Sequence, residues 1–346
     1  MALDWVRSYL QGRSTFVRWK QNSSSVFPLD SGVPQGSALG PLLFSLYIAP
    51  LSGVISSFGV CHHQYADDTQ IYMAVSRADL SVSVSQLENC MAGVHAWLQI
   101  NGLQLNPKKS EVIQFTATRG RDRVDDVAAI RVSNAVIAPV STVRSLGVTL
   151  DKKLSFDQHV TNTCRSCYYH IRALRHVRES LPDDVARTVA CSLVCCRLDY
   201  CNSLFVGMTR ANFSKLQRVQ NSLARVVLRR RKFDHITPAL MELHWLPVEH
   251  RVTFKLATLA FTIKNTGQPG YLRELLPNYQ PVRTLRSSSK HLLGEPTIKT
   301  VLASRGFRHS AAAVWNNLPD SLRCCTNVDR FRHNLKTHLF HLAFTA

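Results

Sequence analysis

The sequence has few features of a membrane or secreted protein. Among its 346 residues we find no apolar run as long as a membrane span, which needs about 20 consecutive apolar residues. Asp4 stands near the start of the chain, where a secretory signal would be basic and then apolar. These absences predict an intracellular protein, in the nucleus, the cytoplasm or both, with reduced thiols and no membrane partner.

Zinc-finger spacing is also missing. Cys164-x-x-Cys167 is the one pair among the ten cysteines with metal-ligand spacing, and no second pair with following histidines stands at the required distance. We interpret the cysteines mostly as small buried apolar residues, with zinc as the less favoured alternative. There is no internal repeat or low-complexity segment, and 45% apolar with 19% charged residues is typical of a globular protein.

Acidic residues are scarce in the second half of the chain. Residues 1–150 carry 12 Lys/Arg and 10 Asp/Glu, a net charge of +2, whereas residues 151–346 carry 30 and 13, a net charge of +17. A strongly basic half indicates a polyanionic partner. Nucleic acid is the first choice and an anionic membrane surface the second.

One acidic pair stands out. Asp67 and Asp68 lie between a strand-like run ending at Tyr65 and another at residues 71–75, which predicts a β-hairpin with both carboxylates at its tip. Adjacent carboxylates repel, and a divalent cation such as Mg²⁺ relieves that repulsion. The alternative is an ordinary turn, in which aspartate caps backbone groups.

A loop rich in glycine and proline precedes this hairpin. Residues 31–44 contain Gly32, Pro34, Gln35 and Gly36 and lead into an apolar helix over residues 42–51. Such a loop allows close approach of a backbone or a phosphate. An ordinary turn and helix start would give the same pattern.

Further elements follow from periodicity. We expect helices at 2–11 and 80–101, and a loop at 102–111 that carries Lys109. We expect a charged, exposed loop at 119–126 and strands at 16–20, 26–29 and 112–116. Further short strands at 130–132, 136–137 and 145–150 are expected to pack as a small sheet.

From about residue 155 the period becomes helical, and Pro182 predicts a helix start at Asp183. A later helix has an apolar stripe beside a basic one, which suits a helix lying along a phosphate backbone, although a solvated face is the alternative. The apolar stripe is Leu216, Val219, Leu223 and Val226; the basic residues are Lys215, Arg218, Arg225 and Arg229, followed by Arg230, Arg231 and Lys232.

The remaining residues predict more helices and a polar loop. The helices are expected at 237–243, 247–264, 270–276, 308–317 and 328–342, and the loop between Pro277 and Pro296. Trp245 and Trp315 are expected in the core, with base stacking as the less favoured role.

Together these stretches resemble the reverse transcriptase of non-long-terminal-repeat (LINE-type) retrotransposons, from motif B onward. Residues 31–42 look like motif B, Tyr65-Ala66-Asp67-Asp68 matches motif C, residues 102–111 are similar to motif D, residues 146–151 look like the primer-grip hairpin, and 243–247, 315–319 and 335–340 are similar to segments of the tail after the thumb. The resemblance implies an α+β fold: an incomplete right-hand polymerase palm of antiparallel sheet and helices at 1–152, an all-α thumb from 153 to 232, and a mainly helical basic region at 233–346.

The resemblance also implies roles for single residues. Asp67 and Asp68 would hold Mg²⁺ in a two-metal site, and Lys109 would assist the leaving pyrophosphate. Gly32, Pro34, Gln35 and Gly36 would line the template and nucleotide site, and Leu146 with Gly147 would contact the primer. The implied partners are an RNA template, a DNA primer or target, and dNTPs.

The sequence departs from this family in one respect. The family places a third carboxylate on a palm strand before motif B, where this chain has only Asp4, in a predicted helix, and Asp30, in a loop. Two-metal catalysis without that group is expected to fail. We therefore expect a truncated copy or fragmentary gene model that is inactive alone; the alternatives are a non-enzymatic nucleic-acid-binding remnant and an expressed relic that folds poorly.

Overall fold

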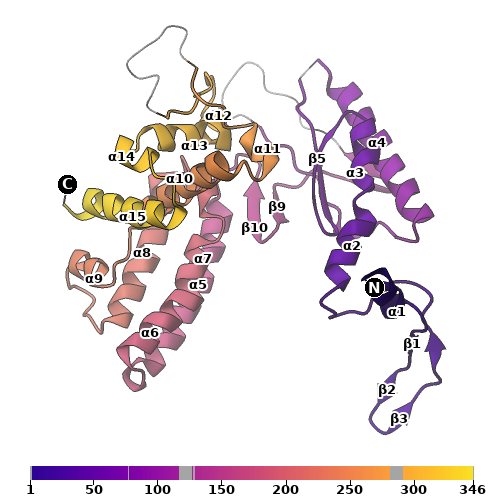
Figure 1. Ribbon diagram of the computed structural model, residues 1–346, viewed down its shortest axis with the longest axis horizontal. Coiled ribbons are helices and arrows are strands. Elements are labelled where there is room, and N and C mark those ends of the chain that lie inside the picture. Colours follow the sequence, from indigo (N-terminus) through magenta and orange to yellow (C-terminus); the bar gives the residue numbers. More distant parts are fainter. Residues whose placement is uncertain (1, 77, 117–126, 128, 281–290, 346) are drawn as a thin grey trace. The chain divides into compact units, whose positions relative to one another are not determined.

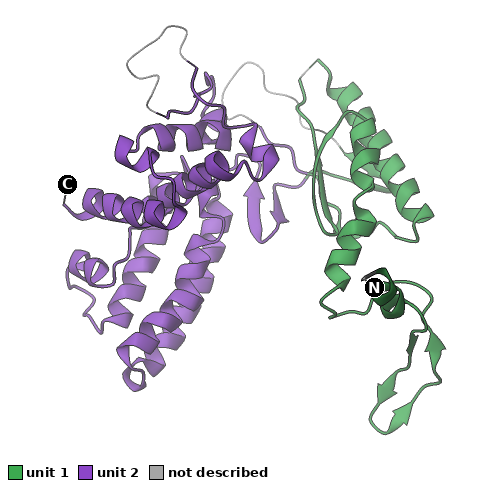
Figure 2. Ribbon diagram, viewed as in Figure 1, with its two compact units in different colours: residues 1–112, 124–139 green, residues 113–123, 140–346 purple. Residues whose placement is uncertain are grey.

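The computed structural model describes residues 2–76, 78–116, 127, 129–280 and 291–345. The chain forms two compact units, residues 1–112 with 124–139 (unit 1) and residues 113–123 with 140–346 (unit 2), as Figures 1 and 2 show. Helices dominate, and every sheet among the described residues is a two-stranded antiparallel ladder. The predicted mixture of helices and antiparallel strands is confirmed, and the division into three domains stays a prediction.

Unit 1 contains four α-helices, a short 3₁₀ helix and four small hairpins or ladders in its described part. Their bounds are α1 Ala2–Leu10, β1 Ser14–Thr15, β2 Arg18–Trp19, β3 Asn22–Ser23, β4 Phe27–Pro28, α2 Gly40–Ile48, α3 Leu51–Ser57, β5 Cys61–Tyr65, β6 Asp68–Tyr72, α4 Leu80–Ile100, η1 Pro107–Lys109, β7 Ile130–Val132 and β8 Ala135–Ile137.

The core of unit 1 is small and forms between α3 and α4. Every third or fourth residue of α4 is apolar, so the helix packs on α3 and on β7, while β5 packs on α3. Gly93 lies against the ring of Phe58, where an added Cβ would come within 2.6 Å of a ring carbon. The buried apolar residues of this cluster are Ile48, Leu51, Ile55, Val60, Cys90, Val94 and Leu98, and Ile130 and Val132 of β7 are buried as well.

The first thirty residues leave many apolar side chains in water. Leu3 is 81% exposed and Trp19 is 73% exposed, and both faces of β1 to β4 are exposed. Strands were predicted at 16–20 and 26–29, but the observed strands β1 to β4 are only two residues long. No further strand in the described part pairs with them.

One apolar stretch corrects an expectation. Residues Gly40–Ser57 are long and apolar enough to cross a membrane by length and composition, so the expectation that no run reaches that length is wrong. The stretch is divided between α2 and α3, with Pro50 at the start of α3. Ile48, Leu51 and Ile55 are buried in the core of unit 1.

Unit 2 begins with a hairpin and continues almost entirely as helices. Their bounds are β9 Thr142–Ser145, β10 Val148–Asp151, α5 Asp157–Val177, η2 Arg178–Ser180, α6 Asp183–Ala190, η3 Cys191–Cys195, α7 Cys196–Asp199, η4 Asn202–Phe205, α8 Arg210–Val227, α9 Ile236–Glu242, α10 Val248–Thr266, α11 Gly270–Arg273, α12 Val301–Arg305, α13 Phe307–Asn316, α14 Asp320–Arg323 and α15 Val328–Phe344.

Helices α5 and α8 lie side by side and run in the same direction (Figure 1). Near their first turns the Asn212 amide donates to Asp157 over 2.6 Å. Near their last turns the guanidinium of Arg178, which is 4% exposed, donates to the carbonyl of Val227 over 2.6 and 2.9 Å. The predicted apolar stripe of α8 is confirmed: Leu216, Val219, Leu223 and Val226 are all buried.

The C-terminal helices share one core with α5 and α8. The rings of Phe261 on α10 and Phe331 on α15 stack with centroids 4.2 Å apart, and Trp315 of α13 lies 6.5 Å from the Phe261 ring. The Trp315 indole donates to the carbonyl of His291 over 2.8 Å. The prediction that Trp245 and Trp315 are core residues is confirmed, with exposures of 8% and 0%.

Two strand predictions are wrong. The run 112–116 forms no strand; Val112 makes a single bridge to Pro139. The run 145–150 is interrupted by a turn at Leu146 and Gly147, both with positive φ, so it becomes the end of β9 and the start of β10. Residues 119–126, and residues 281–290 of the predicted polar loop, lie outside the described residues.

Candidate metal and nucleic-acid sites

The β5–β6 hairpin carries the acidic pair. Tyr65 pairs with Asp68, so the turn consists of Ala66, with φ of +52°, and Asp67. Strand β6 starts three residues earlier than the predicted strand at 71–75. Both carboxylates are exposed at the tip of the hairpin, Asp67 in the turn and Asp68 as the first residue of β6.

One face of this hairpin is held against α2 and α3. His62 Nε2 lies 2.7 Å from Ser52 Oγ, and the Gln64 amide donates to the carbonyl of Ile48 over 3.4 Å. Ile71 packs on the core of unit 1. Because alternate residues of a strand face opposite sides, Tyr65 and Tyr72 are left exposed on the other face, at 64% and 56%.

The described residues around this turn do not supply a complete set of metal ligands. In the part of the chain that the structure describes, no three His, Cys, Asp or Glu side chains gather closely enough to hold a metal ion. Asp4 lies on α1, where it pairs with Arg7 at 3.7 Å, and Asp30 is an exposed loop residue. Among the described residues, this turn therefore brings together two carboxylates, which is fewer than a two-metal site needs.

The Gly-rich loop is shaped by its glycines. Gly32 and Gly36 have φ of +75° and +80°, which only glycine adopts without strain. The Arg13 guanidinium donates to the carbonyls of Ser31 and Gly32 over 3.2 and 2.8 Å, and Ser37 Oγ accepts from the Gly40 N–H at 3.0 Å. Pro34 and Gln35 are exposed between these anchors.

Lys109 ends the short helix η1. The side chain of Asn106 accepts from the Lys108 N–H at 3.1 Å and starts that helix. Lys109 itself is exposed, and its ammonium makes no hydrogen bond or ion pair within the described residues.

The primer-grip-like turn belongs to unit 2. Its two residues, Leu146 and Gly147, have φ of +44° and +80°. The Tyr200 hydroxyl donates to the carbonyl of Leu146 over 2.5 Å, and a Cβ on Gly147 would lie 3.3 Å from the Tyr200 ring. Tyr200 could not be found from the sequence, because it follows the turn by more than fifty residues.

The basic stripe of α8 is shorter than predicted. Helix α8 ends at Val227, and Arg229 lies beyond it with φ of +53°, so the prediction that Arg229 continues the stripe is wrong. Lys215 and Arg218 are exposed on α8. Arg225 is half-buried and donates to the carbonyl of Asp234 over 3.1 Å.

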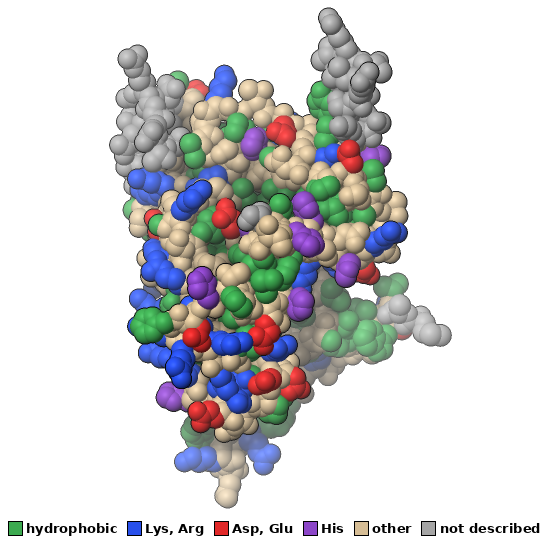
Figure 3. All heavy atoms as spheres, turned by 90° about the vertical axis from the view of Figure 1, so that its left-hand side faces the viewer, with side chains coloured by type: hydrophobic (Ala, Val, Ile, Leu, Met, Phe, Trp, Pro, Cys, Tyr) green, Lys and Arg blue, Asp and Glu red, His purple; other side chains and the backbone are tan. Residues whose placement is uncertain are grey.

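The other basic residues form the loop between α8 and α9. Arg230 pairs with Glu242 at 3.1 Å, and Arg187 approaches the same carboxylate at 3.9 Å. Arg231 and Lys232 are exposed, and their side chains make no ion pair among the described residues. The face in Figure 3 shows lysine and arginine side chains gathered over the helices with acidic side chains between them.

The cysteines are not arranged as a zinc site in the described part of the chain. Burial raises the pKa of Cys164, and it raises the pKa of Cys167 to about 12. Zinc binds the thiolate, so this burial opposes metal binding at the pair. The interpretation of the cysteines as small buried apolar residues is confirmed for Cys90, Cys167 and Cys195. It is wrong for Cys61, Cys191, Cys196 and Cys324, which are exposed.

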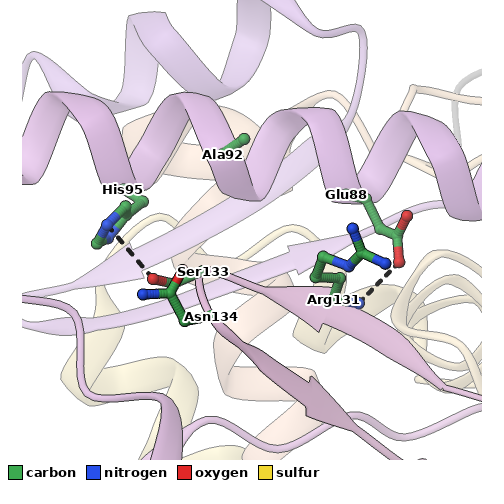
Figure 4. Close-up of a pocket in the computed structure, with 6 residues that line it drawn as sticks. All are labelled: Glu88, Ala92, His95, Arg131, Ser133 and Asn134. Atoms are coloured by element: carbon green, nitrogen blue, oxygen red, sulfur yellow. Dashed lines mark hydrogen bonds between the residues drawn. The ribbon is translucent and has the colours of Figure 1, made fainter.

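A shallow pocket that the sequence did not predict lies between α4 and the β7–β8 hairpin (Figure 4). Glu88 accepts from the Arg131 backbone N–H at 2.8 Å, and His95 Nε2 lies 3.3 Å from Ser133 Oγ. Its volume of about 210 Å³ is below that of common ligand pockets. These contacts tie the hairpin to α4.

Comparison with known proteins finds similarity to one family over the first 150 residues. Residues 1–150 match the family model for reverse transcriptase (RNA-dependent DNA polymerase). The chain is 26% identical over 306 residues to a probable RNA-directed DNA polymerase from transposon BS of Drosophila melanogaster, a match that covers 84% of this chain and 32% of the relative. It is 28% identical over 162 residues to the RNA-directed DNA polymerase from mobile element jockey of the same species, covering 45% and 17%.

A third relative is the retrovirus-related Pol polyprotein from type-1 retrotransposable element R1 of Nasonia vitripennis, 27% identical over 151 residues, with 42% of this chain and 43% of the relative covered. The chain thus spans about a third or less of the first two relatives. No solved structure matches the chain.

Proposed function

Because the family match and the relatives' names support a reverse transcriptase of the LINE type, we propose that unit 1 is part of its polymerase palm. The observation that carries this proposal is the tip of the β5–β6 hairpin, where Asp67 and Asp68 are adjacent inside the matched residues. Carboxylates at such a tip would bind Mg²⁺, which supplies charge stabilisation for nucleotidyl transfer.

The other predicted residues would position substrates. The loop holding Gly32, Pro34, Gln35 and Gly36 would face the RNA template and the incoming dNTP, because its positive-φ glycines leave backbone groups open to close approach. Lys109, an exposed cation, would assist the departing pyrophosphate. Leu146 and Gly147 would contact the DNA primer.

We also propose that residues 1–346 alone do not polymerise. Asp67 and Asp68 are two carboxylates of the three that the family uses, and the described residues offer no third beside them.

The metal proposal is tested by binding rather than by activity. Paramagnetic Mn²⁺ should broaden the amide NMR signals of residues 65–69, and Asp67→Asn should reduce that broadening, whereas Asp79→Asn, at a carboxylate outside the hairpin, should not. Broadening that is equal in wild type and Asp67→Asn would reject the site.

Primer extension with an RNA template, a DNA primer, dNTPs and Mg²⁺ tests the second proposal. We expect no product from the purified chain. Template-dependent synthesis that is lost in Asp67→Ala and kept in Asp79→Ala would show that the chain is a complete polymerase.

A second function, nucleic-acid binding by unit 2, is favoured by the cations that lack acidic partners. Lys215, Arg218, Arg231 and Lys232 are exposed, and residues 151–346 carry a net charge of +17. Binding should weaken with salt, survive Asp67→Ala, and lose affinity and salt dependence when Arg229, Arg230 and Arg231 are replaced by alanine. Binding that does not change with salt would contradict this function.

A further inference from the structure

The loop between α8 and α9 presents an aromatic ring to solvent. Phe233 is 91% exposed, more than any other large apolar side chain in the described part of the chain. It follows four consecutive basic residues, Arg229 to Lys232. Exposing a phenyl ring to water is unfavourable. A ring held in solvent beside four basic residues therefore indicates a contact with a partner.

The loop has a defined backbone. The Arg231 N–H donates to the Asp234 carboxylate over 2.7 Å, and the Asp234 N–H donates back to the Arg231 carbonyl over 3.2 Å. Arg225, on the last turn of α8, donates to the carbonyl of Asp234 over 3.1 Å. The turn that carries Phe233 is therefore fastened to α8, and the ring is held outward instead of folding onto the helices.

The cations around the ring divide into two groups. Arg229 and Arg230 are used within unit 2, since Arg229 donates to the carbonyl of Leu181 over 3.4 Å and Arg230 pairs with Glu242. Lys232 Nζ lies 5.5 Å from the centroid of the Phe233 ring, and Arg231 extends from the same turn. Neither makes an ion pair among the described residues, so both are open to an anionic partner.

A flat ring flanked by open cations matches the chemistry of unpaired nucleotides. Each base offers a face for stacking, and each linkage offers a phosphate for a cation. A duplex hides its base faces, and an anionic membrane surface is held by a larger apolar face than one phenyl ring. The charge on this loop also disfavours an apolar protein groove as its partner.

We propose that Phe233 is a stacking platform for a base of single-stranded nucleic acid, with Arg231 and Lys232 contacting the flanking phosphates. This inference rests on the proposed nucleic-acid binding by unit 2. Beyond that function, the inference assigns nucleic-acid contact to a residue outside the basic stripe. It also predicts that unit 2 binds single strands more tightly than duplexes.

The test compares variants of the full chain with labelled single-stranded and duplex oligonucleotides of about 12 nucleotides and one sequence, by fluorescence anisotropy. Phe233→Leu keeps an apolar side chain but removes the π face, and Phe233→Tyr keeps that face. We expect Phe233→Leu to weaken single-strand binding about tenfold, duplex binding less than about twofold, and Phe233→Tyr to bind like wild type.

Charge variants separate stacking from phosphate contact. Arg231→Ala with Lys232→Ala should weaken single-strand and duplex binding alike and lower the salt slope by about 2. Arg330→Ala, which removes an exposed cation from α15, is the matched control and should change affinity less than about twofold.

Three results would overturn the inference. If Phe233→Leu and Phe233→Tyr bind the single strand with equal affinity, stacking on Phe233 is excluded. Nucleic-acid binding by unit 2 would still stand in that case, provided that the wild type binds both oligonucleotides. Absence of wild-type binding to either ligand at low salt would remove the proposed function as well. Binding to vesicles containing phosphatidylserine that is lost in Phe233→Leu, with unchanged single-strand binding, would assign the ring to a membrane.

Discussion

Single residues join the elements of unit 2. Arg178 is the clearest case, because its buried guanidinium donates to Val227 at the end of α8 and to Leu181 before α6 over 2.9 Å. It also pairs with Asp183, and hydrogen bonding to Arg178 lowers the pKa of that exposed carboxyl. The last carbonyls of a helix need donors, so one arginine satisfies the end of α8 and fixes the start of α6.

Asp151 plays a similar part between β10 and α5. Its carboxylate accepts from the N–H groups of Phe156, Ser155 and Lys153 at 2.7, 3.0 and 3.1 Å. Burial by itself would raise the pKa of Asp151, but these bonds outweigh it and hold the pKa below the usual carboxyl range. The ionised form therefore stabilises the connection.

We predict that Asp151→Asn destabilises unit 2 by about 1 kcal/mol near neutral pH, because the charge-assisted bonds weaken while partial exposure limits the loss. A lowered folded-state pKa stabilises the protein above the ordinary carboxyl pKa, and that contribution is lost as pH falls through the lowered value. Wild type and variant should therefore converge in acid. Urea unfolding across pH measures this.

Asp184→Asn is the control for this prediction. Asp184 is exposed in the first turn of α6, so its replacement should cost less than about 0.5 kcal/mol. A constant gap between wild type and Asp151→Asn at every pH would show that the carboxylate charge is not what stabilises this connection.

Among the elements, the β9–β10 hairpin depends on its turn. Gly147 has φ of +80° and faces the Tyr200 ring closely. We predict that Gly147→Ala costs about 1–2 kcal/mol of local stability, because an L side chain is strained there. Hydrogen exchange should then be faster at residues 142–151.

Tyr200→Phe provides a second variant with an intact turn. It removes the hydroxyl that donates to Leu146 and should speed exchange at the hairpin alone. Unchanged exchange in both variants would show that the turn is held by β9–β10 pairing without Tyr200.

The helices were the elements best predicted from sequence. The helix predicted at 80–101 is α4, Leu80–Ile100, and the helix predicted at 247–264 is α10, Val248–Thr266. Each has a helical apolar period, and a glycine with positive φ follows it, Gly102 after α4 and Gly267 after α10. The end of α8 could not be predicted, since Arg229 takes the same conformation without being glycine.

The sites were predictable only where neighbours in sequence form them. Asp67 and Asp68 are adjacent at the tip of one hairpin, and Gly32 and Gly36 set the backbone conformation of their own loop. The contact of Tyr200 with Leu146 and that of Arg225 with the Phe233 turn arise from packing between elements. The strand expected at 112–116 failed because β propensity forms a strand only where a partner strand is available.

At the scale of the molecule, the two units differ in how much apolar surface they bury. Among the described residues, the main core cluster of unit 1 has seven buried apolar residues around α3 and α4, whereas that of unit 2 joins β10 with helices from α5 to α15. Stability grows with the apolar area removed from water. Unit 1 is therefore the weaker unit.

We predict two unfolding transitions, with unit 1 unfolding first. Limited proteolysis during heating should cleave residues 1–112 while residues 140–346 remain intact. Leu256→Ala in α10 should lower the free energy of unfolding of unit 2 alone, by about 2–5 kcal/mol. Val94→Ala in α4 should lower the free energy of unfolding of unit 1 alone. A single transition shared by both variants would mean that the units fold together.

The exposed side chains of the first thirty residues have a consequence for handling the protein. Leu3, Trp5 and Trp19 expose apolar side chains on which other copies of the chain could associate. The net charge of +19 keeps copies of the chain apart in dilute buffer. Concentrated salt would screen that repulsion. Solubility of the purified chain should therefore fall as the salt rises.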